Sequence, residues 1–274
     1  MSVGTAQEYY GRIGLTGQSN HVDNILNDPA VGDPANEPFD FSQFGLSASV
    51  GRNFTNGYYG QIDLRYQDTD VPANTDDTLH NGSMIAFRVG KDFTNSRFGG
   101  FVGYVDVTGD DTAGSNKMQR VILGIDGEYS INSQISVFGE IGSIGEPMGT
   151  QGTDGEDGIH DGTYGIAGLS YSISPALSVD GQVGFANGTH DGDQLDMMIA
   201  GVGAYYETNV HGLSTYLRVD YTDFYQIGED ERLASTTVQL GIVYNFGSQG
   251  TSSRRPRALA PIEDWLGYSG GHLE

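Results

Sequence analysis

Charged side chains recur at alternate positions of short segments whose other positions are apolar. Asp63 lies between Ile62 and Leu64, and Arg65 follows. This alternation predicts β-strands with one apolar and one charged face. Guanidinium and carboxylate groups on a shared face line a pore and sort solutes by charge, or they pair and brace a filled interior. By this parity the charged inner face holds Arg12, Asp63, Arg65, Arg88, Asp106, Arg120, Asp126, Glu128, Glu140, Asp180, Arg218 and Asp220.

Two other chemistries are weaker candidates. Segments 108–116, 153–162 and 188–196 are rich in Asp and Gly, whose oxygens suit Ca²⁺, but none has EF-hand spacing. We expect solvated acidic turns there and no cofactor. The pairs His160-Asp161 and His190-Asp191 would suit hydrolysis if they met, but no His lies mid-strand beside a Ser. We therefore expect no catalytic residue.

Composition excludes several function classes. The 274 residues contain no Cys, so disulfides and thiolate chemistry are absent, and no apolar run approaches the roughly 20 residues of a transmembrane helix. The glycines alternate within strands and do not open a helix, so there is no phosphate-binding loop. The net charge of −23 opposes binding to nucleic acid.

Twelve alternating segments of about 10–12 residues position the charged face, and each has the length of a tilted strand that crosses a bilayer. Internal repeats support an array of hairpins, because VGRNFTNGYYG at 50–60 is echoed by VGKDFTNSRFG at 89–99. The predicted strands lie near 8–17, 42–53, 58–67, 82–92, 97–107, 118–129, 135–145, 163–173, 177–186, 197–208, 213–222 and 235–246.

Short and long connections alternate along the chain. The six long ones hold 23 of the 36 acidic residues and only two of the 13 basic ones. A soluble sandwich gives no reason to place every long, acidic connection at one end. An up-and-down barrel with short turns at one end and long loops at the other does. The long connections are 18–41, 68–81, 108–117, 146–162, 187–196 and 223–233.

The last strand resembles the C-terminal insertion signal of Gram-negative outer-membrane β-barrels. Its elements are Gln239, Gly241, Tyr244 and Phe246 in the stretch QLGIVYNF. The resemblance covers roughly residues 8–246 and implies a closed antiparallel transmembrane barrel of 12 strands in the outer membrane, with the barrel-assembly machinery as a partner during biogenesis. It extends to porin-like members of this class. Residues 1–7 would lead in from the periplasm.

Residues 247–274 depart from the pattern, since the final Phe ends the chain in many relatives, and they predict a periplasmic tail. Arg254, Arg255 and Arg257 precede a short predicted helix with an apolar stripe around Trp265, the chain's single Trp. Docking to a periplasmic partner, folding back to plug the pore, and a disordered terminus remain alternatives for this tail.

Three functions follow, in order of preference. The first is a porin-like channel for small hydrophilic solutes or ions, weakly cation-preferring because of the acidic loops. The second is a structural or surface-interaction barrel with a plugged lumen, and the third is an outer-membrane hydrolase. Lipid and lipopolysaccharide are the expected surroundings. Loose Ca²⁺ or Mg²⁺ bridging to lipopolysaccharide is compatible both with Ca²⁺ binding by the acidic loops and with solvated acidic turns.

Overall fold

The computed structural model describes residues 9–26, 39–70, 77–111, 114–146, 161–190, 193–227 and 231–247. Within these ranges the fold is all-β, apart from one turn of 3-10 helix, Thr55–Gly57, and no helix has the length and hydropathy needed to cross a membrane. The strands are β1 (Tyr9–Leu26), β2 (Phe39–Asn53), β3 (Tyr58–Asp70), β4 (Asp77–Asp92), β5 (Ser96–Asp111), β6 (Gly114–Ser130), β7 (Ile135–Gly145), β8 (Gly162–Ser172), β9 (Leu177–His190), β10 (Asp193–Glu207), β11 (Leu213–Ile227) and β12 (Glu231–Gly247).

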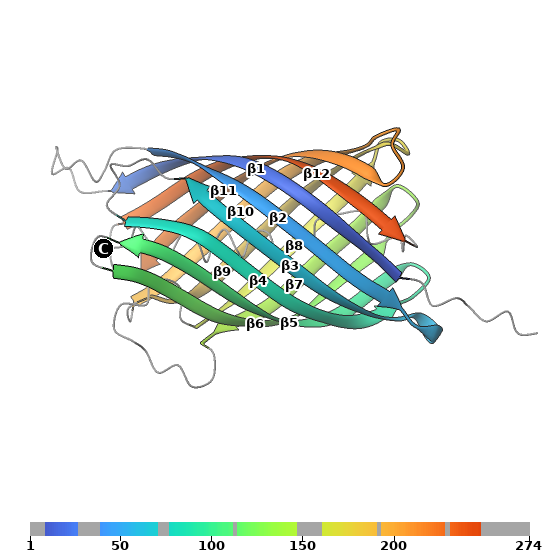
Figure 1. Cartoon of the computed structure of the whole chain (residues 1–274), viewed down its shortest axis with the longest axis horizontal. Helices are drawn as coiled ribbons and strands as arrows, with labels where there is room; N and C mark the ends of the chain where they lie inside the picture. Colours follow the sequence, from blue (N-terminus) through green and yellow to red (C-terminus); the bar gives the residue numbers. More distant parts are fainter. Residues whose placement is uncertain are drawn as a thin grey trace, which may run out of the picture.

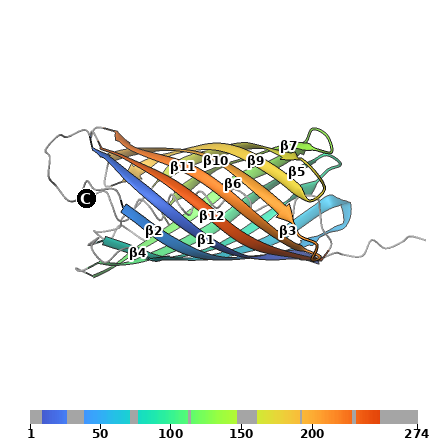
Figure 2. The same cartoon turned by 90° about the horizontal axis from the view of Figure 1, so that it is seen from above.

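The twelve strands form one closed antiparallel barrel in which each strand pairs with its sequence neighbours and β12 pairs with β1. The fold class predicted from the sequence is therefore confirmed. Followed once around the barrel from Tyr10, the hydrogen-bonded register returns to β1 at Asn24, a shift of 14 residues from position 10 to position 24. Such a shift requires tilted strands, and the strands run obliquely to the long axis in Figures 1 and 2.

The two ends of the barrel differ. The short connections gather at the end where β1 begins and β12 ends (Figure 1), which we call the turn end; the opposite end is the loop end. Backbone bonds close the short turns, as from Phe54 N to Tyr58 O at 2.7 Å and from Phe93 N to Ser96 O at 2.7 Å. Gly57 and Gly212 both have φ +79°, a left-handed conformation that glycine adopts without steric cost.

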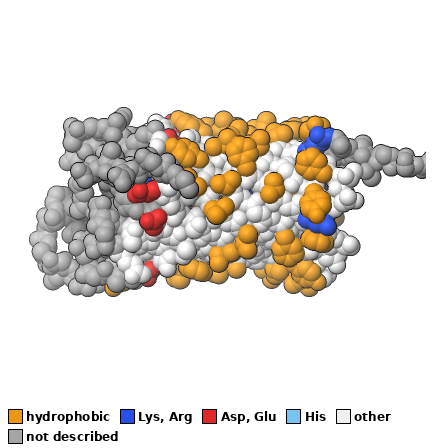
Figure 3. Space-filling view, turned by 90° about the horizontal axis from the view of Figure 1, so that it is seen from below, with side chains coloured by type: hydrophobic (Ala, Val, Ile, Leu, Met, Phe, Trp, Pro, Cys, Tyr) orange, Lys and Arg blue, Asp and Glu red, His pale blue; other side chains and the backbone are white. Residues whose placement is uncertain are grey.

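The outward face carries an apolar surface between these ends. Ile13, Leu64, Leu123 and Leu240 are 48–62% exposed, which a water-soluble sheet would avoid but a lipid-facing wall requires. Figure 3 shows hydrophobic side chains along the barrel, with acidic ones toward the loop end and basic ones at the turn end. Eight exposed tyrosines also lie on this face, and rings of this kind suit the interfacial girdles of an outer-membrane barrel: Tyr9, Tyr58, Tyr66, Tyr129, Tyr171, Tyr206, Tyr221 and Tyr244.

The repeated hairpins place a cation over aromatic rings at the turn end. The Arg52 guanidinium lies 5.1 Å from the Tyr9 ring and 5.5 Å from the Phe54 ring. Lys91, at the equivalent position of the echo, lies 5.0 Å from the Tyr58 ring and 5.2 Å from the Phe93 ring. Amphipathic pairs of this kind suit a membrane interface, where an apolar body and a charged tip meet different media.

The lumen as the candidate functional site

A first charged cluster surrounds Arg88 of β4. Arg88 is 2% exposed, and its Nη1 lies 2.6 Å from Asp126 Oδ2, while its Nε lies 3.7 Å from Asp63 Oδ2. Its guanidinium carbon lies 5.0 Å from the Phe101 ring centroid. Glu140 of β7 adds a third carboxylate that interacts electrostatically with Arg88 and accepts a 3.0 Å hydrogen bond from the Tyr164 hydroxyl. One guanidinium therefore faces three carboxylates.

Hydrogen bonds extend this cluster toward the turn end. Asp63 Oδ1 accepts 2.6 Å bonds from Ser49 and from Gln61. Gln61 accepts from the Tyr10 hydroxyl at 3.1 Å, and this hydroxyl accepts from Arg97 Nη2 at 3.1 Å. The Arg97 guanidinium also lies 3.4 Å from the Tyr59 ring centroid, a close cation–π contact. These contacts fix the rotamers of side chains from β1 to β5.

A second charged cluster occupies β9 to β11. Arg218 donates from Nε to both oxygens of Asp220 at 2.9 and 2.7 Å, and from Nη1 to Asp180 at 2.8 Å. Tyr205 stacks on Tyr216 with ring centroids 5.6 Å apart. We call the two clusters together the charged belt, defined as Asp63, Arg88, Asp126, Glu140, Asp180, Arg218 and Asp220. It holds five carboxylates and two guanidiniums.

The lumen between the belt and the loop end has two unlike walls. On β12, β1, β2 and β3 a chain of neutral polar groups follows the sheet. Thr237 donates to Asn20 at 2.6 Å, Asn20 to Gln43 at 3.2 Å, and Gln43 to Thr69 at 3.1 Å. This polar wall can exchange hydrogen bonds with water or with a solute.

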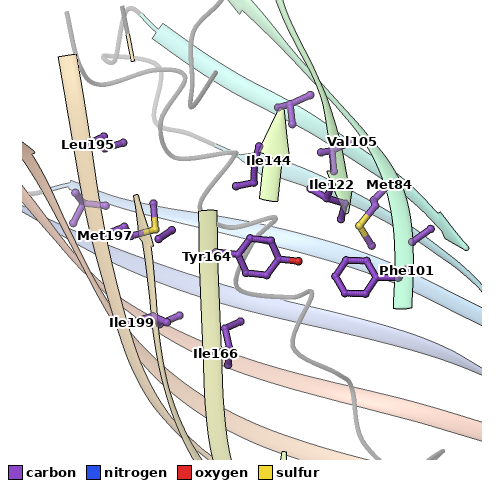
Figure 4. Packing of buried hydrophobic residues seen from close by; sticks show 14 of the residues in the cluster. Met84, Phe101, Val105, Ile122, Ile144, Tyr164, Ile166, Leu195, Met197 and Ile199 are labelled. Atoms are coloured by element: carbon purple, nitrogen blue, oxygen red, sulfur yellow. The ribbon is translucent and has the colours of Figure 1, made fainter. Parts of the chain in front are cut away.

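The other wall, supplied mainly by β4 to β10, is apolar. Its side chains point toward one another in Figure 4 and are at most 5% exposed. We define the apolar wall as Met84, Ala86, Phe101, Val105, Ile122, Ile144, Ile166, Ala186, Met197 and Ile199. This wall was not predicted, since the sequence interpretation assigned every apolar face to lipid.

Eleven of the twelve predicted inner-face charges lie on the strand face that points into the barrel. Asp106 does not. On β5 the inner parity belongs to Phe101, Val105 and Val107, which are 3%, 2% and 5% exposed. Asp106 shares the outward parity of Val102, which is 44% exposed, and accepts a 3.0 Å hydrogen bond from its cross-strand partner Gln119. The prediction was wrong because the inner face of β5 is apolar from Phe101 to Val107, so that the polar side chain in this part of the strand points outward.

Arg97 is the residue of this network that the sequence interpretation missed. It is not among the predicted inner-face charges, yet it is 7% exposed, lies on the inner parity of β5 and also pairs with Asp92 at 3.3 Å. Arg97 and Phe101 share one face of β5, so the position of Arg97 could have been predicted only if Phe101 had first been assigned to the interior.

The residues of the predicted insertion signal alternate on β12. Gln239 and Gly241 face inward, and Tyr244 and Phe246 are 46% and 37% exposed on the outward face. Val243, which interrupts the alternation in the sequence, is 9% exposed and contacts Tyr205 and Tyr216 inside. The Tyr216 ring lies over Gly241, where any side chain would meet it, and its hydroxyl is 2.7 Å from Thr16 Oγ1.

Several predicted loop features lie outside the described residues. His160, Asp191 and most of 153–162 fall there, so the suggested His–Asp pairings have no structural description. Within the described ranges, no group of three or more potential metal ligands is found. His21 pairs with Asp40 at 2.6 Å on the exposed outer surface near the loop end.

Comparisons with known proteins bear on the fold. No protein-family model matches the sequence, and no curated protein matches it. Among solved structures, the COG4313 outer membrane channel from Pseudomonas putida F1 aligns with TM-score 0.59 and 14% identity over 88% of this chain and 96% of that one. The translocator domain of autotransporter NalP from Neisseria meningitidis aligns with TM-score 0.50 and 15% identity over 86% of this chain and 88% of that one. The KdgM porin in complex with disordered oligogalacturonate aligns with TM-score 0.48 and 11% identity over 85% of this chain and 99% of that one.

At these identities the likeness concerns the fold alone, and a channel and a translocator share it. The resemblance first drawn from the last strand is confirmed at that level: the chain has the closed barrel architecture of channels and porins of the bacterial outer membrane.

Proposed function

We propose that this chain is an outer-membrane channel for passive diffusion of small hydrophilic solutes or ions, with a weak preference for cations. The observation that supports it best is the charged belt. The belt places five carboxylates and two guanidiniums on the inner face, where charge costs free energy unless water or partners solvate it. A polar, charged lumen is what a passage for hydrophilic solutes requires.

The net negative charge of the charged belt supports the cation preference. Carboxylates outnumber guanidiniums in both clusters, and fixed negative charge raises the local concentration of cations. Arg12, Arg65, Arg97 and Arg120 also face inward and moderate this field, which is why the preference is weak. The acidic residues of the long connections act in the same direction at the loop end.

Conductance and reversal potential of the refolded full chain in a planar bilayer under a KCl gradient test the proposal. We expect discrete steps and a reversal potential on the cation side. A reversal potential on the anion side would overturn the selectivity. A correctly inserted barrel that conducts under no condition would overturn the channel and favour the structural barrel with a plugged lumen.

A further inference from the structure

Two cations on the outward face of the turn end have no anionic partner in the barrel. Arg52 of β2 and Lys91 of β4 share the outward parity of Val50 and Val89, which are 53% and 67% exposed. Among the residues that the structure describes, neither cation forms a salt bridge, and the Arg52 Nε has no hydrogen-bond partner. By contrast, three arginines of the lumen all pair with carboxylates: Arg88, Arg97 and Arg218. The charge of Arg52 and Lys91 is therefore open to an anion from outside the barrel.

Aromatic rings hold the two cations in one continuous row. The Phe54 ring folds back on Gly60, the cross-strand partner of Arg52, and an added side-chain carbon there would lie 3.5 Å from this ring. Tyr58 is the cross-strand partner of Lys91. On β4 and β5 the row ends in two rings packed edge to face with centroids 6.3 Å apart. We define the basic row as Tyr9, Arg52, Phe54, Tyr58, Lys91, Phe93 and Phe98.

The basic row lies where the lipid-facing surface meets the short turns. Toward the loop end, the next outward side chains on its strands are apolar and exposed, as are Val50 of β2, Ile62 of β3 and Val89 of β4. Short turns of outer-membrane barrels face the periplasm, so the row lies at the headgroups of the periplasmic leaflet. Basic side chains lie among hydrophobic ones at this end in Figure 3. An occupant of this place needs a polar group beside the cations and apolar chains beside the wall.

We propose that the basic row binds an anionic phospholipid of the periplasmic leaflet, with the phosphate at Arg52 and Lys91 and the acyl chains along β2 to β4. Guanidinium and ammonium groups are strong ligands of phosphate oxygens, and basic residues at a membrane surface attract anionic lipids. The rings keep the cations at the surface of the barrel. Two strand spacings and an offset of two residues separate their Cα atoms by about 12 Å, which two long side chains and a headgroup can span.

The opposite side of the turn end has rings without cations. Tyr129, Tyr171, Tyr206 and Tyr244 are between 40% and 49% exposed on β6, β8, β10 and β12. Within the described parts of β6 to β12, no Lys or Arg lies on the outward face at this end. Rings alone suit the interface of any lipid. We therefore expect selectivity for anionic lipid beside β3 and none beside β8.

Quenching of Trp fluorescence by brominated lipids measures this selectivity. Trp265→Phe removes the single native Trp, which belongs to the predicted tail and lies outside the described residues. On this background Ile62→Trp reports on lipid beside the basic row, and Leu169→Trp reports on lipid beside β8. The native side chains are 42% and 48% exposed and lie four and three residues from the turn end of their strands.

The refolded full chain is placed in phosphatidylcholine bilayers that contain brominated phosphatidylglycerol or brominated phosphatidylcholine. Phosphatidylglycerol should associate several-fold more strongly than phosphatidylcholine with the Ile62→Trp chain. The Leu169→Trp chain should show no preference. Equal association of the two lipids at Ile62→Trp, or the same preference at both positions, would overturn the proposal.

Charge variants show whether the two cations account for the selectivity. Arg52→Gln with Lys91→Gln should abolish the preference at Ile62→Trp. Arg52→Lys with Lys91→Arg keeps both charges and should retain it. Arg12→Gln with Arg65→Gln removes the same net charge from the inner face and should also retain it. No loss in the first variant, or an equal loss in the inner-face variant, would contradict a site at the basic row.

Inorganic phosphate distinguishes a lipid from a soluble anion. Added phosphate should leave the preference as it is in chloride of equal ionic strength, because the acyl chains of the lipid also bury apolar surface. Loss of the preference in phosphate alone would mean that the row binds soluble phosphate and would overturn the lipid assignment. The measurement does not require conduction, so a chain that conducts no ions can still show the lipid preference while the proposed channel fails.

Discussion

The charged belt and the apolar wall share one lumen and differ in what holds them together. The belt is a set of directional contacts, such as the bond from Arg218 to Asp180 at 2.8 Å, and each member fixes the next. The apolar wall has side chains such as Ile122 and Ile166, which pack without direction. The difference shows that inward parity in this barrel does not mean polar, because polarity changes with height along the lumen.

The largest expected effect comes from placing a charge in the apolar wall. Ile122→Asp puts an unpaired carboxylate where the native side chain is 0% exposed. An uncompensated buried charge costs about 3–5 kcal/mol, and denaturant unfolding of the refolded barrel measures it. Gln43→Glu on the polar wall is the control and should cost far less, because its neighbours Asn20 and Thr69 are polar. Equal losses would mean that the two walls do not differ.

The next effect comes from removing the cation of the second cluster. Arg218→Met leaves Asp180 and Asp220, which are 8% and 4% exposed, without their guanidinium partner. We expect a loss of about 3 kcal/mol in unfolding free energy. The variant that also carries Asp180→Asn and Asp220→Asn should recover part of the loss. If the triple variant is no more stable than the single one, the paired charges do not account for the stability of this region.

A smaller effect is expected where a ring packs on a glycine. Gly241→Ala forces the Tyr216 ring from its place and breaks its contact with Thr16, at a cost of about 1–3 kcal/mol for overpacking. Gly17→Ala is the control, since nothing lies within 4 Å of an added side-chain carbon there. Adding Tyr216→Leu to Gly241→Ala should relieve the clash. A Gly17 variant as unstable as the Gly241 variant would mean that the Tyr216 ring does not account for the loss, since a compatible Gly→Ala change on its own stabilises through the unfolded chain.

The fold was predictable because the outward face is uniform. Lipid requires apolar side chains at the outward positions of the span, so the alternation of apolar and polar residues predicted the strands. Their number, together with the insertion signal that includes Tyr244 and Phe246 of β12, predicted that the sheet closes into a barrel. The inner face has no single environment, because its side chains contact charged, polar and apolar neighbours in different parts of the lumen. The parity was misassigned in β5, where Phe101 and Val105 face inward and Asp106 faces outward. The strands also run further toward the loop end than predicted, with β1 reaching Leu26, because alternation stops beyond the lipid while backbone pairing continues.

The most direct test of the charged belt as the selective part of the passage compares two acidic residues on opposite faces. Glu140→Gln removes an inward charge while its side-chain oxygen can still accept from Tyr164, and Asp106→Asn removes an outward charge hydrogen-bonded to Gln119. The reversal potential of each variant is measured under the same KCl gradient as the native chain. We predict a shift of a few millivolts toward zero for Glu140→Gln, on the order of the change expected when one of several fixed charges is removed, and no shift for Asp106→Asn. No shift for Glu140→Gln, or an equal shift for both, would contradict a lumen in which the belt selects the passing ion.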